Sequence, residues 1–333
     1  MDPLSQGLLG ACFSSSFANK NNFKIATLCG ALGGVTPDLD VFIKSENDPL
    51  LFLEYHRHFT HSLAFVPLGG LLVSLFLMIF LKNYPFKNIY LFSTLGFLTH
   101  GILDSCTSYG TNLFWPFSDT RVAWNIISIV DPIFTFILIF FMVFCFLYKS
   151  TKFIRFGTLL SFSYLILGVF QYQNVKSYVY DLAKKRDHKI ERILLNPTIG
   201  NNILWRTVYE FNNNYYINAV YIPLFGKISH KKGSKVEVID KEDIFPKINM
   251  DSIQRNDIKR FAYFSMNFIY LHPDYDNIIS DLRYGSLPYD DKSLWGIQIN
   301  ENNSDKHVNF LNLRNFNNNQ YSEFWSMLKG NMK

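Results

Sequence analysis

Cysteine is scarce in this 333-residue sequence, and its positions are uneven. All four cysteines lie before residue 150, and no two have the CxxC spacing of a thiolate zinc knuckle. The spacing therefore argues against a thiolate zinc finger, and residues after 150 cannot form an internal disulfide. The net charge of +5 is modest and is not gathered in one basic tract. Nucleic acid is therefore not expected as a partner.

Charged residues are also sparse before about residue 170, where long apolar runs dominate. After that point charges, asparagines and turn residues become frequent. The shift predicts two domains, a membrane-embedded helical domain at 1–170 and a soluble β-rich domain at 171–333. The start of the chain has no Lys or Arg before Lys20. It therefore does not resemble a secretory signal, which begins with basic residues.

Six apolar stretches are candidates for crossing a membrane. About 20 mainly apolar residues are needed to cross a hydrocarbon core of about 30 Å. The candidates are Leu4–Ala18, Phe23–Ile43, His61–Leu81, Asn88–Leu103, Ala123–Tyr148 and Phe153–Phe170. The first two are short and rich in Gly, Ala and Ser, so re-entrant or interfacial helices are the alternative for them. The fold expected for the first half is a membrane α-helical bundle of about six hydrophobic helices.

Basic residues in the connections indicate an orientation. If all six stretches cross, three short loops on one side carry only positive charge, from Lys20, Lys24, Lys82, Lys87, Lys149, Lys152 and Arg155. Positive charge in short loops marks the cytoplasmic side. We therefore expect a multi-pass protein of the cell inner (plasma) membrane with an extracytoplasmic C-terminal domain. Basic residues just after the last stretch, such as Lys184 and Lys185, oppose this orientation.

Histidines and aspartates gather at the other side of the expected membrane domain. Under alternating topology, the end of the second stretch, the start of the third and the end of the fourth lie on one face. Ionisable residues at membrane depth are costly and are therefore functional candidates. Imidazole and carboxylate together suit zinc, manganese or iron. The sequence predicts a divalent metal site, with zinc first and manganese or iron as alternatives, formed by Asp38, Asp40, His56, His61, His100 and Asp104.

Each part of this set has a local alternative. His100 and Asp104 are four residues apart, so on a helix they share a face, but they would also fit a buried hydrogen-bonded pair. Asp38 follows Pro37 and would also fit a turn or helix cap. The histidines of the 56–61 segment would also suit an interfacial belt. Metal binding is favoured because all these groups converge on one face.

Three charged residues beside this set are candidates for the chemistry itself. Arg57 and Arg121 would hold a phosphate or carboxylate through two hydrogen bonds, and their alternative is solvated loop charge. Asp131 precedes Pro132 near an apolar run. Its carboxylate would accept a hydrogen bond from a histidine ligand and orient that ring, and the alternative for Asp131 is a helix cap.

Several motifs occur in one order along the chain: Met1–Gly7, Gly34–Asp40, His56-Arg57 with Thr60–Ser62, His100–Asp104 with Tyr109–Thr111, Trp115–Ser118, Ile129–Pro132, Asn202–Arg206 and Asp281–Gly285. With these motifs the chain resembles the inner-membrane metal-dependent hydrolases, the LexA-regulated, YdjM-like family, which is distantly similar to zinc-dependent phospholipase C. The resemblance implies a helical metal site that hydrolyses a phosphoester. Many members have His where this chain has Gln6, a poor zinc ligand, which implies fewer metals or a different one.

The second half has the pattern of a β domain. Short stretches rich in Ile, Val, Tyr and Phe are separated by turn residues. The strands expected are Ile203–Phe211, Tyr215–Leu224, Lys235–Ile239, Phe261–Leu271 and Leu294–Ile299. Residues 171–195 are expected to form a helix leaving the membrane. A small, mostly antiparallel β (α+β) domain follows from this pattern.

Two functions fit these observations. The first is a membrane-bound metal-dependent hydrolase acting on a phosphoester or lipid-linked substrate through a metal-activated water. Its partner would be a membrane lipid or lipid-linked substrate, because the predicted site lies at the membrane face. The alternative is a non-enzymatic membrane protein with a structural or metal-binding His/Asp site. A transporter is disfavoured because the polar groups stop at one face, apart from Asp131.

Overall fold

The computed structural model describes residues 1–332 of the chain, which divide into two compact units. The first unit contains residues 1–43, 55–169 and 199–201, and it is helical. The second contains residues 44–54, 170–198 and 202–332, and it holds all the β-strands. The division along the main chain falls inside one long helix, between Val169 and Phe170.

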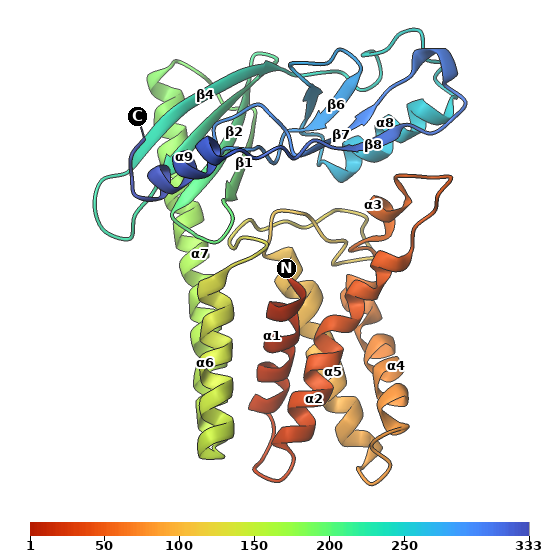
Figure 1. Cartoon of the computed structure of the whole chain (residues 1–333), viewed down its shortest axis with the longest axis vertical. Coiled ribbons are helices and arrows are strands. Elements are labelled where there is room, and N and C mark those ends of the chain that lie inside the picture. Colours follow the sequence, from red (N-terminus) through yellow and green to blue (C-terminus); the bar gives the residue numbers. More distant parts are fainter. Residues whose placement is uncertain (333) are drawn as a thin grey trace. The chain divides into compact units, whose positions relative to one another are not determined.

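The helical unit is built from helices that run between two ends. Figure 1 shows that the turns after α1, α4 and α6 lie at one end, whereas the N-terminus lies at the other. The elements of this part of the chain are α1 (Pro3–Ser16), α2 (Phe23–Val35), η1 (Thr36–Phe42), α3 (Leu51–Tyr55), η2 (Phe59–His61), η3 (Leu63–Phe65), α4 (Val66–Met78), α5 (Phe86–Ser105), α6 (Pro132–Tyr148) and α7 (Thr151–Lys185).

Glycines let α1, α2 and α5 pack backbone to backbone. A Cβ atom added at Gly34 would lie 2.6 Å from the carbonyl oxygen of Gln6, and one at Gly96 would lie 2.2 Å from that of Gly30. Such contacts are too short for any side chain, so only glycine permits this helix spacing. The close packing brings the end of α2 against the first turns of α1 and the last turns of α5.

Two helical segments are long and apolar enough to cross a membrane, Phe23–Phe42 and Thr151–Lys185. A third candidate is the pair Leu51–His61 and Leu63–Met78, which is bent by 57°. The six spans expected from the sequence are not confirmed among the described residues. The 14 residues of α1 extend about 21 Å, short of the hydrocarbon thickness. In addition, the 17-residue α6 begins at Pro132, so the expected helical start at Ala123 is a loop.

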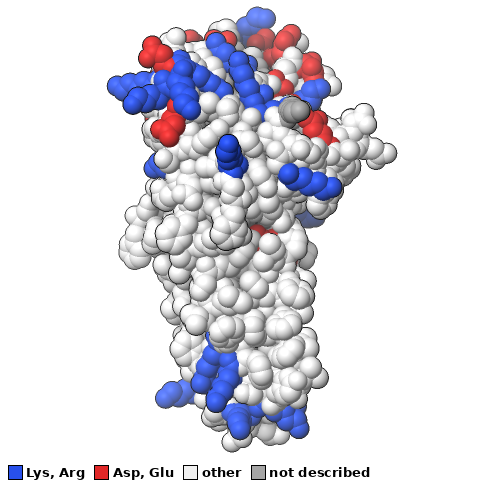
Figure 2. Space-filling view, turned by 90° about the vertical axis from the view of Figure 1, so that its left-hand side faces the viewer, with Lys and Arg blue, Asp and Glu red and all other residues white. Residues whose placement is uncertain are grey.

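Charge is distributed unevenly over the helical unit. Figure 2 shows Lys and Arg at the end that carries the turns after α1, α4 and α6, with a largely uncharged surface next to them. Those turns contain basic residues and no Asp or Glu. Well exposed apolar side chains of this unit include Phe80, Phe136 and Leu159. Such a surface suits contact with lipid chains rather than with water.

The β-strands form two four-stranded antiparallel sheets, β1-β2-β3-β4 and β5-β6-β7-β8. This bears out the C-terminal antiparallel β structure expected from the sequence. The bounds are β1 (Arg192–Pro197), β2 (Leu204–Phe211), β3 (Asn214–Tyr221), β4 (Ser229–Glu237), α8 (Ile253–Phe264), β5 (Ile269–Leu271), β6 (Ile278–Asp281), β7 (Trp295–Gln298), η4 (Glu301–Asn303), β8 (Asn309–Asn312) and α9 (Asn318–Leu328).

One expected strand is partly a helix. The stretch expected from Phe261 to Leu271 begins inside α8 and becomes a strand only at Ile269. The buried residues Ile258, Phe261 and Ala262 recur at helical spacing on α8, which explains why this aromatic run is helical.

The segment 44–54 belongs to the second unit although it interrupts the first in sequence. Arg260 of α8 contacts both carboxylate oxygens of Asp48, at 2.8 and 3.1 Å, and Glu54 at 2.9 Å. Burial opposes ionisation of Asp48, but the hydrogen bonds from Arg260 outweigh it and lower the pKa of this carboxyl. The phenyl rings of Phe52 and Phe310 pack edge to face nearby.

Candidate metal centre

Four predicted ligands meet in the helical unit, brought there by three separate elements. Asp38 lies in η1, His61 ends η2, and His100 and Asp104 lie one turn apart near the end of α5. One ligand atom from each of the four lies within 4.8 Å of the others. His61, His100 and Asp104 are buried, whereas the side chain of Asp38 is 22% exposed. The centre is therefore closed on most sides and open beside Asp38.

The second nitrogen of each histidine has an acceptor. His100 Nδ1 lies 2.6 Å from the carbonyl oxygen of Gly34, which can only accept, so Nδ1 carries the proton. His61 Nδ1 lies 3.0 Å from Thr60 Oγ1 and 3.2 Å from Asp40 Oδ2. Because Thr60 donates its own hydroxyl proton to Asp40, His61 Nδ1 is also the donor. These contacts leave the Nε2 lone pair of each ring free for a cation.

The two Nε2 atoms of His61 and His100 face each other at 2.9 Å. Two lone pairs at this distance repel unless a positive charge, either a proton or a metal ion, lies between them. Asp38 Oδ1 lies 3.5 and 3.4 Å from the two nitrogens, and Asp104 Oδ2 lies 3.2 and 3.6 Å from them. Donors of a tetrahedral zinc site are about 3.3 Å apart for bonds of about 2.0 Å. The separations therefore fit a metal ion with two imidazole and two carboxylate ligands.

Asp104 is held from several directions. Gln6 Nε2 donates to Asp104 Oδ1 at 2.8 Å, and the amino group of Met1 also contacts this oxygen. Asp104 Oδ2 is buried and lies 3.0 Å from Arg57 Nε, but it accepts no hydrogen bond of good geometry among the described residues. A buried carboxylate oxygen without a hydrogen bond is suited to ligate a cation. In this arrangement Gln6 positions the carboxylate of Asp104.

Asp40 and His56 lie beside the four-residue group. Asp40 Oδ1 lies 2.8 Å from His56 Nδ1, and Asp40 Oδ2 accepts from the Arg57 amide and the Thr60 hydroxyl. Asp38, Asp40 and His56 also form a group able to hold a metal, so Asp38 belongs to two such groups. The oxygens of Asp40 are already occupied by hydrogen bonds, which suits a residue that orients histidines.

Arg57 is buried, and its backbone lies in the left-handed region at φ 65°. A non-glycine residue seldom adopts this conformation, and here it directs the backbone N–H to Asp40 Oδ2. The guanidinium donates to Thr107 Oγ1 at 2.9 Å and lies over the ring of Tyr109, 4.7 Å from its centroid. Arg121 lies 5.8 Å from the same centroid and donates to the carbonyl oxygen of Gly110.

Asp131 is the N-cap of α6. Its carboxylate accepts from the amides of Ile133 and Phe134 and from the hydroxyl of Tyr164, all within 3.1 Å. Those contacts match the helix-cap alternative. Its role in orienting a histidine ligand stays a prediction.

Sequence reasoning missed the residues that hold the ligands in place. Thr60 lies inside the histidine motif, and its hydroxyl links Asp40 to His61. Thr107 and Tyr109 hold Arg57. Thr60 and Tyr109 belong to the motifs that carry the family resemblance and Thr107 lies between two of them, which was the only signal, because a threonine or tyrosine alone gives no indication of its partner.

A third group able to hold a metal occurs in the second unit, made of Asp48, Asp257 and His307. Arg260 contacts both carboxylates of this group, and Asp257 Oδ2 lies 2.9 Å from His307 Nδ1. A guanidinium between the carboxylates makes this group an ion-pair network, and we assign no metal to it.

Comparisons with known proteins place the centre in a family context. A family model described as YdjM inner membrane protein matches residues 1–175, just over half of the chain. The match spans every residue of the centre. The chain is also similar to a Bacillus subtilis (strain 168) protein named Uncharacterized protein YfhP, at 24% identity over 272 residues, which cover 79% of this chain and 77% of that protein. No solved structure matches the chain.

Proposed function

The chain belongs to the YdjM inner membrane protein family, and we propose that it is a membrane-bound metal-dependent hydrolase that acts on a phosphoester or lipid-linked substrate. The observation that carries the proposal is the pair of facing Nε2 atoms of His61 and His100, 2.9 Å apart, with carboxylate oxygens of Asp38 and Asp104 beside both. These four residues are the proposed ligands. The residues around them hold each ring in the tautomer that ligation needs.

The metal would polarise the scissile group and lower the pKa of a bound water toward neutrality. The donor set of two imidazoles and two carboxylates favours zinc, with manganese or iron as alternatives. Asp38 is the most exposed of the four ligands, so substrate and water would approach from its side. The buried ligands on the other side exclude solvent and keep the site in one geometry.

Asp40 and His56 are proposed to support the centre. Asp40 holds the Nδ1 sides of both His56 and His61, so it fixes two rings through one carboxylate. The alternative, in which Asp38, Asp40 and His56 bind a second ion with Asp38 as a bridge, follows from their proximity. The two arrangements differ in metal content. One bound ion per chain would support the orienting role. Two bound ions in the wild type, one of which is lost in His56→Ala, would assign Asp40 and His56 as ligands.

Arg57 and Arg121 are proposed to stabilise negative charge on the substrate. Both guanidinium groups lie near the ring of Tyr109, at 4.7 and 5.8 Å from its centroid. Arg57 is also 3.0 Å from the proposed ligand Asp104, so one arginine adjoins the metal position directly. A phosphate suits this pair because guanidinium groups recognise phosphate oxygens through paired hydrogen bonds. The membrane family makes a lipid or lipid-linked phosphoester the favoured substrate.

The proposed orientation places the basic turns in the cytoplasm and the centre at the opposite face. Lys20, Lys82 and Lys149 lie in turns at one end of the helical unit, which is the end that carries blue side chains in Figure 2. Positive charge in short loops marks the cytoplasmic side. The centre, formed where α2 and α5 end, lies at the other end of the unit. The C-terminal unit would then be extracytoplasmic.

A non-enzymatic role is the second candidate, and the number of ligands favours it. A structural metal site is usually closed by four protein ligands, whereas a catalytic site keeps an open position. Asp38, His61, His100 and Asp104 supply four. The helical unit would then use the ion to join η1, η2 and α5.

Hydrolysis of defined lipids by the purified protein separates the two candidates. The full chain, in nanodiscs loaded with zinc, manganese or iron, is incubated with phosphatidylglycerol, phosphatidylethanolamine, phosphatidic acid and an isoprenyl phosphate. The hydrolase proposal predicts release of phosphate or headgroup that His100→Ala abolishes and His230→Ala retains. Bound metal without release from any of these substrates would favour the structural role.

A further inference from the structure

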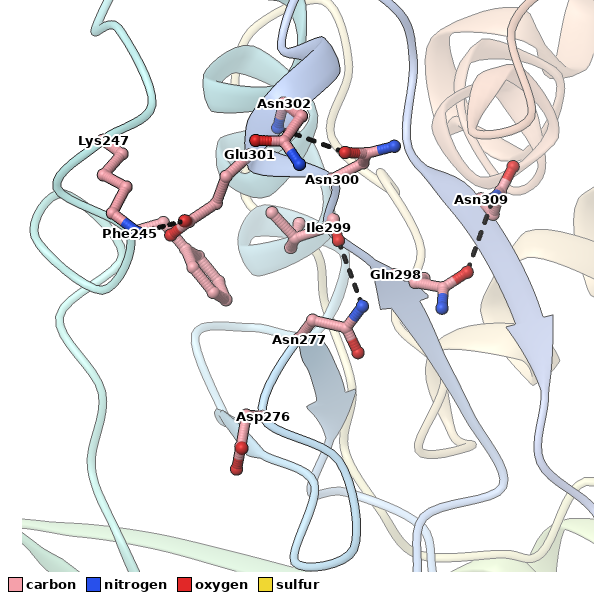
Figure 3. Close-up of a pocket in the computed structure, with 10 residues that line it drawn as sticks. All are labelled: Phe245, Lys247, Asp276, Asn277, Gln298, Ile299, Asn300, Glu301, Asn302 and Asn309. Atoms are coloured by element: carbon pink, nitrogen blue, oxygen red, sulfur yellow. Dashed lines mark hydrogen bonds and ion pairs between the residues drawn. The ribbon is translucent and has the colours of Figure 1, made fainter.

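An open cavity of about 650 Å³ occurs in the second unit, apart from the proposed metal centre. Its volume is in the range of about 300–1,000 Å³ typical of small-molecule sites. Five carboxamide side chains line it, from Asn277, Gln298, Asn300, Asn302 and Asn309. Figure 3 shows that the side chain of Gln298 extends toward Asn309, away from the ring of Phe245.

Two buried side chains of α8 hold two segments of the cavity lining. Arg255 donates to the carbonyl oxygens of Phe245 and Ile248 at 2.7 and 3.0 Å. Gln254 accepts from the Asn300 amide at 2.9 Å and donates to the Asn300 carbonyl oxygen at 3.2 Å. Both α8 side chains are 1% exposed. The walls are therefore set before any ligand arrives, which lowers the entropic cost of binding.

The carboxamides keep much of their hydrogen-bonding capacity. Asn277 uses Nδ2 for the Ile299 carbonyl oxygen at 3.3 Å, and Asn300 uses Oδ1 for the Asn302 amide at 3.1 Å. The contact between Asn309 Nδ2 and Gln298 Oε1 is long, at 3.5 Å. Each carboxamide offers two donors and an acceptor oxygen, so the lining provides both donors and acceptors. A ligand with many hydroxyl groups, which both donate and accept, matches this lining.

The charges in the cavity disfavour an anion. Lys247, the one cation of this lining, is mostly exposed and lies 3.2 Å from Glu301. Asp276 adds a negative charge on the same lining. A phosphate or carboxylate would meet repulsion here. The side chains of Phe245 and Ile299 also line the cavity but are buried, so its accessible lining is mainly polar.

We propose that this cavity binds a neutral saccharide of one to three sugar units, through the carboxamides of Asn277, Gln298 and Asn309. The saccharide would come either from a free oligosaccharide or from the headgroup of a glycolipid. The proposal stands independently of the metal centre, because no residue of that centre lines the cavity.

Binding of defined sugars to the full chain tests the proposal. The chain is reconstituted in phospholipid nanodiscs, since alkyl glycoside detergents carry the very chemistry under test. Maltotriose, cellotriose, chitotriose and mannotriose are titrated by calorimetry and by saturation-transfer NMR, with trigalacturonate as an anionic probe. A second series uses nanodiscs containing a neutral diglucosyl lipid. We expect one neutral sugar or the glycolipid to bind, and trigalacturonate at least about tenfold more weakly.

Variants locate the binding. Gln298→Leu and Asn309→Leu should each weaken binding about tenfold, and Asn319→Leu, an exposed asparagine outside the cavity, should not change it. Thermal unfolding shows whether each variant folds, and two variants are used so that one unfolded protein does not end the test. Absence of binding by every neutral probe would overturn the proposal. Equal binding by trigalacturonate, or binding unchanged in both folded variants, would do so too.

Discussion

His61 and His100 meet through their Nε2 atoms at 2.9 Å, and each ring is held from behind at Nδ1, by Asp40 with Thr60 and by the Gly34 carbonyl oxygen respectively. The orientation of the two rings is therefore determined by residues that are not themselves among the proposed ligands. This relationship leads to predictions about the supporting residues that differ from those for the ligands.

Asp40→Asn is expected to weaken metal binding without abolishing it. The substitution keeps the volume of the side chain but removes the negative charge that orients His56 and His61. Loss of such an outer contact typically lowers metal affinity about 10-fold to 100-fold. Competition with a metallochromic chelator measures the affinity. An affinity equal to that of the wild type would show that Asp40 does not orient the ligands, and complete loss of binding would make it a ligand.

Gly101→Ala is expected to displace His61 and to lower the metal content. A Cβ atom at residue 101 would lie 2.0 Å from the His61 carbonyl oxygen, a backbone atom that cannot rotate away. Gly7→Ala is the milder comparison, since its Cβ would meet a side-chain carbon of Val35 at 3.0 Å. Metal content and melting temperature should both fall more for Gly101→Ala. Equal effects of the two substitutions would contradict the close approach of α5 to His61.

Arg57→Lys is expected to reduce hydrolysis by about tenfold to a hundredfold while metal stays bound. A lysine supplies charge but cannot reproduce the contacts with Asp104 and Thr107 and the position over Tyr109. Arg57→Gly removes the guanidinium without adding backbone strain at φ 65°, so a loss of rate in this variant comes from the missing guanidinium. Steady-state rates and metal content are measured together. Wild-type rates in both variants would remove Arg57 from the substrate site.

The ion pair between Asp48 and Arg260 predicts that the stability of the second unit depends on pH. Because the pKa of Asp48 is lowered in the folded chain, its contribution is fully present above the unfolded value of about 3.8 and is lost as pH falls through the folded value. The melting temperature of the wild type should exceed that of Asp48→Asn at pH 6, and the difference should shrink below about pH 4. A difference that is constant from pH 6 to pH 3 would contradict the ion pair.

The sequence predicted which distant residues lie close together more accurately than it predicted the role of each residue. The spacing of His100 and Asp104 on a helix and the ends of the apolar stretches indicated one shared face, and the four-residue group lies where those ends meet. The hydrogen bonds that distinguish Asp40 from Asp38 depend on the position of Thr60 and on the path of η1, which spacing does not determine. The number of membrane spans was not confirmed, because apolar content alone does not separate a short packed helix such as α1 from a spanning one.

The contacts of the segment 44–54 also could not be predicted from its local sequence pattern. Its ends adjoin residues of the centre in sequence, yet its own contacts are with Arg260 and Phe310, more than 200 residues later. Similarly, the aromatic run at Phe261 predicted a strand, but Phe261 and Ile258 are both buried on one face of the helix α8. In both cases a tertiary contact decides the structure.

The metal content of the purified chain tests the central claim most directly. The protein is purified with zinc, manganese and iron supplied, passed over a chelating column and analysed by inductively coupled plasma mass spectrometry, together with His61→Ala, His100→Ala and the control His230→Ala. The account predicts about one equivalent of one metal in the wild type and the control, and less than about a tenth of that in the two centre variants. Equal metal in all four proteins, or none in the wild type, would contradict it.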